Sequence, residues 1–175
     1  GFIRFWPGPG IGGHCIPVDP LFLNFAAKKF GFESKFVKLS VDINFKTIKF
    51  VEEKITSFLK KNDIKFHLAK ILLLGLAYKK NIDDYRESAS TKLFDHLSKK
   101  KIKKIKFYDP YFKKNNVPKK INLLNKLTSK KLLEFDLVVL VTDHDSFDYK
   151  FINKHAKKII DCRGRFSLSD KVIRG

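Results

Sequence analysis

The chain has 175 residues, and its 37 Lys and Arg against 18 Asp and Glu give a formal net charge of +19. A hydrophobic content of 43%, with 18 Phe, is enough for a substantial core and argues against intrinsic disorder. The longest apolar stretch, residues 71–78, is too short to cross a bilayer, and residues 1–6 lack the apolar centre of a signal peptide. The 2 cysteines provide no disulfide framework and fit a reducing cytoplasm.

The positive charge first suggests a polyanion, such as nucleic acid, as a partner. However, arginine is rare among the basic residues, whereas proteins that read bases and phosphates use arginine forks as well as lysine charge. Lysine is scattered over nearly every expected element. We therefore favour solvated lysine faces, expect neither nucleic acid nor a membrane as a partner, and keep nucleotide phosphates as a smaller target.

A loop rich in Gly and Pro, residues 7–20, is expected to run into the first helix. Asp19 and Pro20 suit the N-cap and the first position of that helix, so that Cys15 would lie just ahead of its N-terminus. Residues 37–62 carry apolar side chains at helical spacing and predict a second, long helix. We expect this helix to join two parts of the molecule.

Beyond residue 63, short apolar runs alternate with helical stretches. The expected strands are residues 71–77, 105–108, 137–142 and 158–161, and the expected helices are 90–100, 129–135 and 148–156. This alternation predicts an α/β fold with a doubly wound parallel sheet. Ligands of such sheets bind beyond the carboxyl ends of the strands. Polar clusters follow three expected strands there, at residues 79–86, 143–145 and 161–163.

The Gly/Pro loop contains the first candidate site. Gly10, Gly12 and Gly13 would let backbone N–H groups approach a ligand closely. A helix N-terminus favours the nucleophilic thiolate form of Cys15, although a lone cysteine is more often a small buried apolar residue. His14 is a poor candidate for the base that acts on Cys15, because neighbouring residues of an extended segment point to opposite sides.

The turn after the first expected strand has one glycine, Gly75, where a dinucleotide-binding fingerprint has three. By this criterion, the sheet does not belong to an ordinary NAD-binding domain. Lys79 and Arg86 flank the connection from this strand to the next helix. There the lysine charge and the arginine fork can hold a phosphate or a carboxylate, but it is equally possible that both are ordinary exposed surface charges. No Cys/His spacing supports zinc, His144 between two aspartates is a weak hint, and we expect no metal.

Five motifs resemble the UDP-sugar 6-dehydrogenases of the UDP-glucose/GDP-mannose dehydrogenase family, in the family's order. They are PGPGIGGHCIPVDP at 7–20, GLAYKKNIDDYRES at 75–88, FYDPYF at 107–112, VTDHDSFDY at 141–149 and DCRGRF at 161–166. The branch that they resemble most is the UDP-N-acetylglucosamine or UDP-N-acetylmannosamine dehydrogenases of bacterial surface-polysaccharide pathways. Val18 stands where the UDP-glucose branch usually has lysine.

The resemblance implies a division of the chain into three parts. Residues 1–36 would be the catalytic-cysteine loop and helix of the family's central domain, residues 37–66 the connecting helix, and residues 67–175 a Rossmann-like UDP-sugar-binding domain. The family's N-terminal NAD-binding domain has no counterpart here, and the sequence contains no Met. We therefore expect a C-terminal portion of such an enzyme, inactive by itself, whose full-length form is a cytoplasmic homodimer or higher oligomer.

The resemblance also implies roles for single residues. Cys15 matches the catalytic thiol and Asp19 the acid that assists it, while Arg86 matches an arginine that reaches toward NAD. The residues expected to bind the UDP-N-acetylhexosamine substrate are Gly10, Gly12, Gly13, Lys79 and Arg163. The alternative interpretation is a nucleotide-sugar-binding fragment that performs no chemistry.

Overall fold

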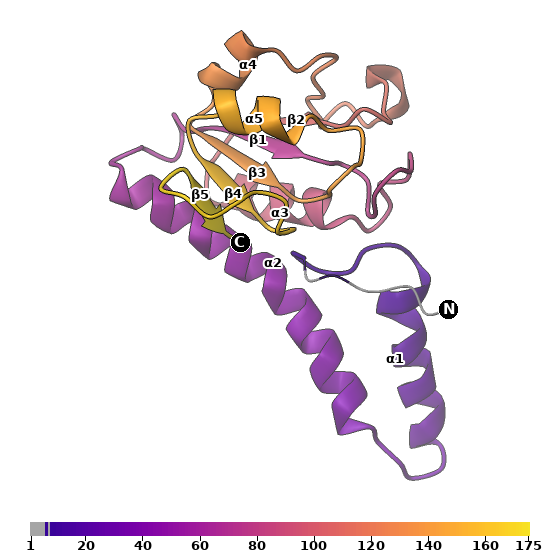
Figure 1. The fold of residues 1–175 in the computed structure, drawn as a ribbon. Helices are drawn as coiled ribbons and strands as arrows, with labels where there is room; N and C mark the ends of the chain where they lie inside the picture. The colour runs from indigo at the N-terminus through magenta and orange to yellow at the C-terminus, as the bar shows by residue number, and fades with distance from the viewer. Residues whose placement is uncertain (1–5, 7) are drawn as a thin grey trace.

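The computed structural model describes residue 6 and residues 8–175. A hairpin of two helices, α1 (Cys15–Lys28) and α2 (Lys35–Lys61), projects from the α/β domain that follows it in the chain (Figure 1). Within the described residues, no helix is both long and apolar enough to span a membrane.

The α/β domain is built on a five-stranded sheet in the order β2-β1-β3-β4-β5, in which every neighbouring pair is parallel. The strands are β1 (Lys70–Leu74), β2 (Lys104–Tyr108), β3 (Leu137–Leu140), β4 (Ile159–Asp161) and β5 (Val172–Arg174). The remaining helices are α3 (Ala89–Lys99), a short 3-10 turn (Lys114–Asn116), α4 (Ser129–Glu134) and α5 (Tyr149–His155). The predicted doubly wound α/β fold is confirmed.

The sheet is covered on both faces, which explains why its central strands are continuously apolar. In β1, Ile71 and Leu73 belong to one core cluster, which includes apolar residues of α2 and α3. Leu72 and Leu74 belong to a second cluster on the opposite face, which includes residues of α4 and α5. All four side chains are fully buried.

Helix α2 runs from the helical hairpin to the α/β domain. Its second half packs on the sheet through Ile48, Val51, Ile55 and Leu59, whose spacing of three or four residues places them on one helix face. Ser34 caps its start by accepting a hydrogen bond from the Val37 N–H.

The expected start of the first helix was wrong. Helix α1 begins at Cys15 with His14 at the N-cap, and Pro20 lies inside it. The earlier start is possible because Pro17 lies in the first turn, where backbone N–H groups have no intrahelical acceptor to lose. Asp19 is therefore a residue of the helix rather than its cap, and Cys15 is the first helical residue.

Much of the hairpin's apolar surface has no partner among the described residues. Large apolar side chains are exposed along α1, the turn after it and the first half of α2; they are Ile16, Val18, Leu21, Phe22, Leu23, Phe25, Phe30, Phe32, Phe36, Leu39, Ile43 and Phe45. An apolar surface of this extent is typical of a contact region rather than of a solvated face.

Candidate functional site

A cavity of 580 Å³ lies where the Gly/Pro loop passes over the carboxyl edge of the sheet. Its lining includes residues that follow β1, β3 and β4, together with residues of the loop from Gly8 to Gly12. The strand order reverses between β1 and β3, and such a switch point is where ligands of open α/β sheets bind. Four cationic side chains but one carboxylate line the cavity; they are Lys79, Lys80, Arg163, Arg165 and Asp143. The cavity therefore suits an anion.

A buried histidine fixes the loop that carries Lys79 and Lys80. The Asn81 backbone N–H donates to Nδ1 of His144 at 2.9 Å, so the ring proton is on Nε2, which donates to Oδ2 of Asp109 at 2.9 Å. The imidazole is completely inaccessible to solvent. It thus joins the segments that follow three different strands, and it holds the backbone beside the two lysines.

Asp109 lies at the centre of this network. Its Oδ2 accepts the Leu76 and Ala77 backbone N–H groups at 2.7 and 3.0 Å. Burial by itself would raise the pKa of Asp109, but the hydrogen bond from His144 and those from backbone N–H groups outweigh it and lower the pKa. Asp109 is therefore an ionised anchor that sets how the chain turns after β1.

A second buried carboxylate shapes the other side of the cavity. Asp161 at the end of β4 accepts hydrogen bonds from the backbone N–H groups of Arg163, Gly164 and Phe166. The loop after β4 is consequently wrapped around one side chain. Nε of Arg163 donates to Oδ1 of Asp143 at 2.8 Å, which leaves the two outer nitrogens of the guanidinium for other partners.

The loop glycines allow close packing against the α/β domain. A Cβ atom at Gly12 would lie 2.7 Å from Cβ of Tyr78 and 2.8 Å from the backbone oxygen of Glu87. Gly13 has a φ of +84° and lies against the ring of the same tyrosine, while a Cβ at Gly8 would collide with the guanidinium of Arg163. The sequence predicted contact between this loop and a ligand, but it did not predict contact with the domain itself.

The structure brings several of the predicted site residues together. Gly10, Gly12, Lys79 and Arg163 line the same cavity, although they come from three separate segments of the chain. Gly13 does not line it, but it is buried directly beside Tyr78, which does. These five residues were assigned to substrate binding, and that role stays a prediction.

The two predicted catalytic residues lie near the cavity but are not among the residues that line it. Cys15 and Asp19 are both exposed on α1, one helical turn apart and therefore on one helix face. Cys15 does not line the cavity, but the next residue, Ile16, does. The thiol is thus not enclosed in an apolar interior. Cys162, in contrast, is buried, and burial raises its pKa to about 12.

Arg86 lies outside the cavity. Its guanidinium pairs with Asp84, with Nη2 2.6 Å from Oδ2, and the hydrogen bonds from Arg86 lower the pKa of that carboxyl. The side chain of Arg86 is 69% exposed. The structure therefore does not join Arg86 to the residues that form the candidate site.

Sequence reasoning did not single out five further lining residues, namely Tyr78, Lys80, Thr142, Asp143 and Arg165. Lys80 and Asp143 lie inside polar clusters that follow expected strands, so position alone could have identified them. Arg165 comes two residues after Arg163 in the DCRGRF motif, just beyond the cluster considered. Tyr78 carried no comparable signal, because its contacts with the loop glycines depend on the tertiary fold.

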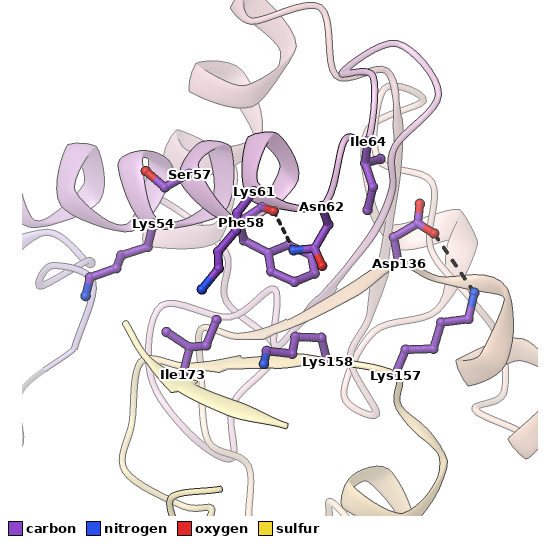
Figure 2. Close-up of a pocket in the computed structure, with 10 residues that line it drawn as sticks. All are labelled: Lys54, Ser57, Phe58, Lys61, Asn62, Ile64, Asp136, Lys157, Lys158 and Ile173. Atoms are coloured by element: carbon purple, nitrogen blue, oxygen red, sulfur yellow. Dashed lines mark hydrogen bonds and ion pairs between the residues drawn. The ribbon is translucent and has the colours of Figure 1, made fainter. Parts of the chain in front are cut away.

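A second cavity, of 550 Å³, lies at the opposite edge of the sheet (Figure 2). It is formed between the end of α2 and the segments that precede or form β3, β4 and β5, and its apolar lining is Phe58, Ile64 and Ile173. Its charged lining residues are Lys54, Lys61, Lys157, Lys158 and Asp136. This is the amino edge of the parallel strands, where ligands of such sheets do not usually bind.

The chain was compared with known protein families and with curated proteins. Residues 72–167 match the UDP-binding domain of the UDP-glucose/GDP-mannose dehydrogenase family, and residues 1–46 match the central domain of that family. A UDP-N-acetyl-D-mannosamine dehydrogenase from Methanococcus vannielii is 33% identical over 156 residues, which are 87% of this chain and 34% of the relative. The corresponding enzyme from Escherichia coli K12 is 30% identical over 90% of this chain and 38% of its own length.

Solved structures agree with these matches. A UDP-D-ManNAc dehydrogenase from Pyrococcus horikoshii superposes with a TM-score of 0.75 at 30% identity, over 93% of this chain and 37% of the other. A GDP-mannose dehydrogenase from Pseudomonas aeruginosa has the same fold, with a TM-score of 0.77 at 24% identity, over 95% of this chain and 39% of the other. The chain spans roughly a third of the length of the relatives that it matches. The chain belongs to the UDP-glucose/GDP-mannose dehydrogenase family.

Proposed function

We propose that this chain supplies the catalytic cysteine and the UDP-sugar-binding domain of an NAD-dependent UDP-N-acetylhexosamine 6-dehydrogenase. The observation that carries the proposal is the cationic cavity at the carboxyl edge of the sheet, covered by the loop that leads into Cys15. The family membership of the chain and the names of its relatives support a nucleotide sugar as the occupant.

The cavity offers suitable groups for a diphosphate. Lys79 takes part in none of the ion pairs found among the described residues, and its Nζ lies 5.6 Å from the centre of the Tyr78 ring. Arg163, which follows β4 rather than β1, contributes the free end of its fork. A point charge and a planar fork together neutralise and orient a pyrophosphate group better than either does alone.

Cys15 would act on the oxidised sugar. Its thiolate adds to the C6 aldehyde carbon, a C–S bond forms, and the carbonyl oxygen takes up a proton to give a thiohemiacetal. Departure of the C6 hydride to the acceptor that the longer protein supplies, together with loss of the hydroxyl proton, would convert this adduct to a thioester. Water then attacks the carbonyl carbon, the C–S bond breaks, and the uronate and the free thiol are released. Asp19, on the same face of α1, would assist proton transfer near the sulfur.

The residues of this chain do not themselves fit NAD. At the turn after β1, Ser90 donates a hydrogen bond to the Gly75 carbonyl, and a Cβ at Gly75 would collide with Thr142. The turn is thus filled by protein, with no room for the close approach of a pyrophosphate. In the longer protein NAD would serve as the hydride acceptor, with Arg86 the residue of this chain that we assign toward it. We expect the chain alone to have no dehydrogenase activity.

The substrate branch and the biological setting are also part of the proposal. Val18 on α1 and the similarity to UDP-N-acetylmannosamine dehydrogenases support an N-acetylhexosamine over glucose. The product would be a uronate for surface-polysaccharide synthesis in the cytoplasm. The exposed apolar surface of α1 and α2 supports a homodimer or higher oligomer in the full-length enzyme.

Calorimetric titration of the chain with UDP tests binding. We expect saturation at submillimolar UDP and at least a tenfold loss of affinity for Lys79→Ala, because a hydrogen bond between charged groups contributes about 1.5–3 kcal/mol. Lys61→Ala removes the same charge at the amino edge and should leave the affinity unchanged. Undetectable saturation at millimolar UDP would contradict the proposal.

The chemistry requires the full-length enzyme. With UDP-N-acetylmannosamine or UDP-N-acetylglucosamine, each uronate formed should be accompanied by two NADH, and Cys15→Ser should abolish turnover. One NADH with accumulation of aldehyde would contradict the thioester step. Binding of UDP without turnover by the full-length protein would support instead the alternative, a nucleotide-sugar-binding fragment that performs no chemistry.

A further inference from the structure

Arg165 is a cation of the cavity to which neither the family resemblance nor the proposed chemistry assigns a role. It lies in the loop between β4 and β5 and lines the cavity with Arg163. The backbone on both sides of it is fixed, because the N–H groups of Gly164 and Phe166 each donate to the buried carboxylate of Asp161. The loop therefore presents this side chain from a defined position.

An aromatic platform supports the side chain of Arg165. The centre of its guanidinium lies 4.7 Å from the centroid of the Tyr149 ring, the geometry of a cation–π contact. The Tyr149 hydroxyl donates to the His144 backbone oxygen at 2.8 Å, and the ring packs edge-on against Phe166 at 5.5 Å. Burial raises the pKa of Tyr149 to about 12, so the platform stays a neutral phenol.

Arg165 forms no ion pair with the residues that the structure describes. Among the ion pairs of the described chain, Arg163 binds Asp143 and Lys80 binds Asp145, whereas Arg165 takes part in none. Its field lowers the pKa of Asp145, after the larger effects of hydrogen bonds from Asn81 and Lys80. No ion pair of the described chain therefore neutralises the guanidinium, which lines the cavity.

A solvated surface arginine is the simpler alternative, and it explains less. Holding an arginine side chain over a ring on a fixed loop costs rotamer entropy, and an arginine that binds no ligand gains nothing in return. When the same arginine binds an anion, that cost has already been met before the ligand arrives, which increases affinity. Stacking on an aromatic ring while the fork binds a phosphate is a usual role of arginine.

We propose that Arg165 is a further substrate-binding residue, which donates to a phosphate oxygen of the nucleotide diphosphate, and that Tyr149 is its positioning residue. This inference rests on the proposed function, namely that the cavity takes a UDP-sugar. It adds a third anion-binding group to Lys79 and Arg163, from the same loop as the latter.

The test is calorimetric titration of the chain and its variants with UDP and with uridine. Arg165→Gln should lower the affinity for UDP at least tenfold and leave any uridine binding unchanged, because the lost donors face phosphate. Lys61→Gln is the matched control, since it removes one exposed charge at the amino edge (Figure 2). It should bind UDP as the wild type does.

Two further variants separate charge from position. Tyr149→Leu keeps the charge of Arg165 but removes the platform, and it should weaken UDP binding severalfold, whereas Tyr149→Phe keeps the ring and should weaken it less. Circular dichroism and thermal unfolding establish that each variant is folded. Wild-type UDP affinity in Arg165→Gln, alongside a loss in Lys79→Ala, would overturn this inference alone. If the wild type does not bind UDP, the proposed function is overturned and this inference with it.

Discussion

The two edges of the sheet carry cavities of nearly equal volume, 580 Å³ at the carboxyl edge and 550 Å³ at the amino edge. Each is lined by four cationic side chains and one carboxylate, so their formal charges are the same. The difference lies in what holds the cations. In a chain with a net charge of +19, charge alone therefore identifies no site.

At the carboxyl edge, buried carboxylates fix the backbone that carries the cations. Asp109, through His144, holds the loop after β1, and Asp161 holds the loop after β4. At the amino edge, Lys61 lies in the last turn of α2, where its charge stabilises the helix carbonyls. Nζ of Lys157 lies 4.0 Å from Oδ1 of Asp136. A site differs from a basic surface by the positioning of its charges.

The largest expected effect is on stability. Asp109→Asn replaces a buried acceptor by an amide that cannot accept the same set of N–H groups, and we expect a loss of about 3 kcal/mol in the free energy of unfolding. The matched change at the amino edge is Asp136→Asn, whose parent carboxylate accepts the Lys70 N–H and is partly exposed. That variant should lose about 1 kcal/mol. Urea unfolding measures both, and equal losses would remove the contrast.

A smaller effect is expected at the covering loop. Gly12→Ala places a methyl group against Tyr78 and the backbone of Glu87, and it should cost about 1–3 kcal/mol of stability or displace the loop. Gly31→Ala is the control, because its added Cβ meets nothing within 4 Å although its φ is +76°. If Gly12→Ala costs no more than Gly31→Ala and binds UDP normally, the packing of this loop is not required for the site.

The next expected effect comes from changing the position of the loop that carries Lys79 while the charge of the cavity stays the same. His144→Gln removes the acceptor of the Asn81 N–H, and it should lower UDP affinity about threefold to tenfold although no cavity charge is lost. The effect should vanish in the Lys79→Ala background if the histidine acts through that loop. Additive losses in the double variant would show that His144 supports the fold in general rather than the position of Lys79.

The smallest effect is a pH dependence. The pKa of Asp109 is lowered in the folded state, so its contribution is fully present above the carboxyl's usual value of 3.8 and is lost as pH falls through the lower, folded value. The stability difference between wild type and Asp109→Asn should therefore stay constant from neutral pH down to 3.8 and shrink as pH falls from there toward the lower, folded pKa. A difference that shrinks already above pH 5 would contradict an ionised, stabilised carboxylate.

The sequence predicted the strands of the sheet well because their apolar runs are local. The expected strand 71–77 ends earlier, at Leu74, because Gly75 takes a φ of +86° and the following N–H groups turn onto Asp109. Strand β5, Val172–Arg174, was missed because three residues in a basic segment give no periodic signal. Its strand conformation depends on pairing with β4.

Position after a strand was enough to select Lys79 and Arg163, which line one cavity in the structure, while their role stays a prediction. Residues that reach the cavity through contacts between distant segments could not be selected in this way. His144 is 35 residues from Asp109 and 63 from Asn81, and the sequence offered it only as a weak metal ligand. Arg165 is in the loop after β4 and gains its platform from Tyr149, the first residue of α5. Such contacts become visible only when the chain is folded.

A crystal structure of the chain with UDP tests the central claim most directly. We expect the diphosphate at the carboxyl edge, within hydrogen-bond distance of Lys79 and Arg163 and beneath the loop that leads into Cys15. Density for UDP among the lysines of the amino edge, with the carboxyl-edge cavity empty, would contradict the account.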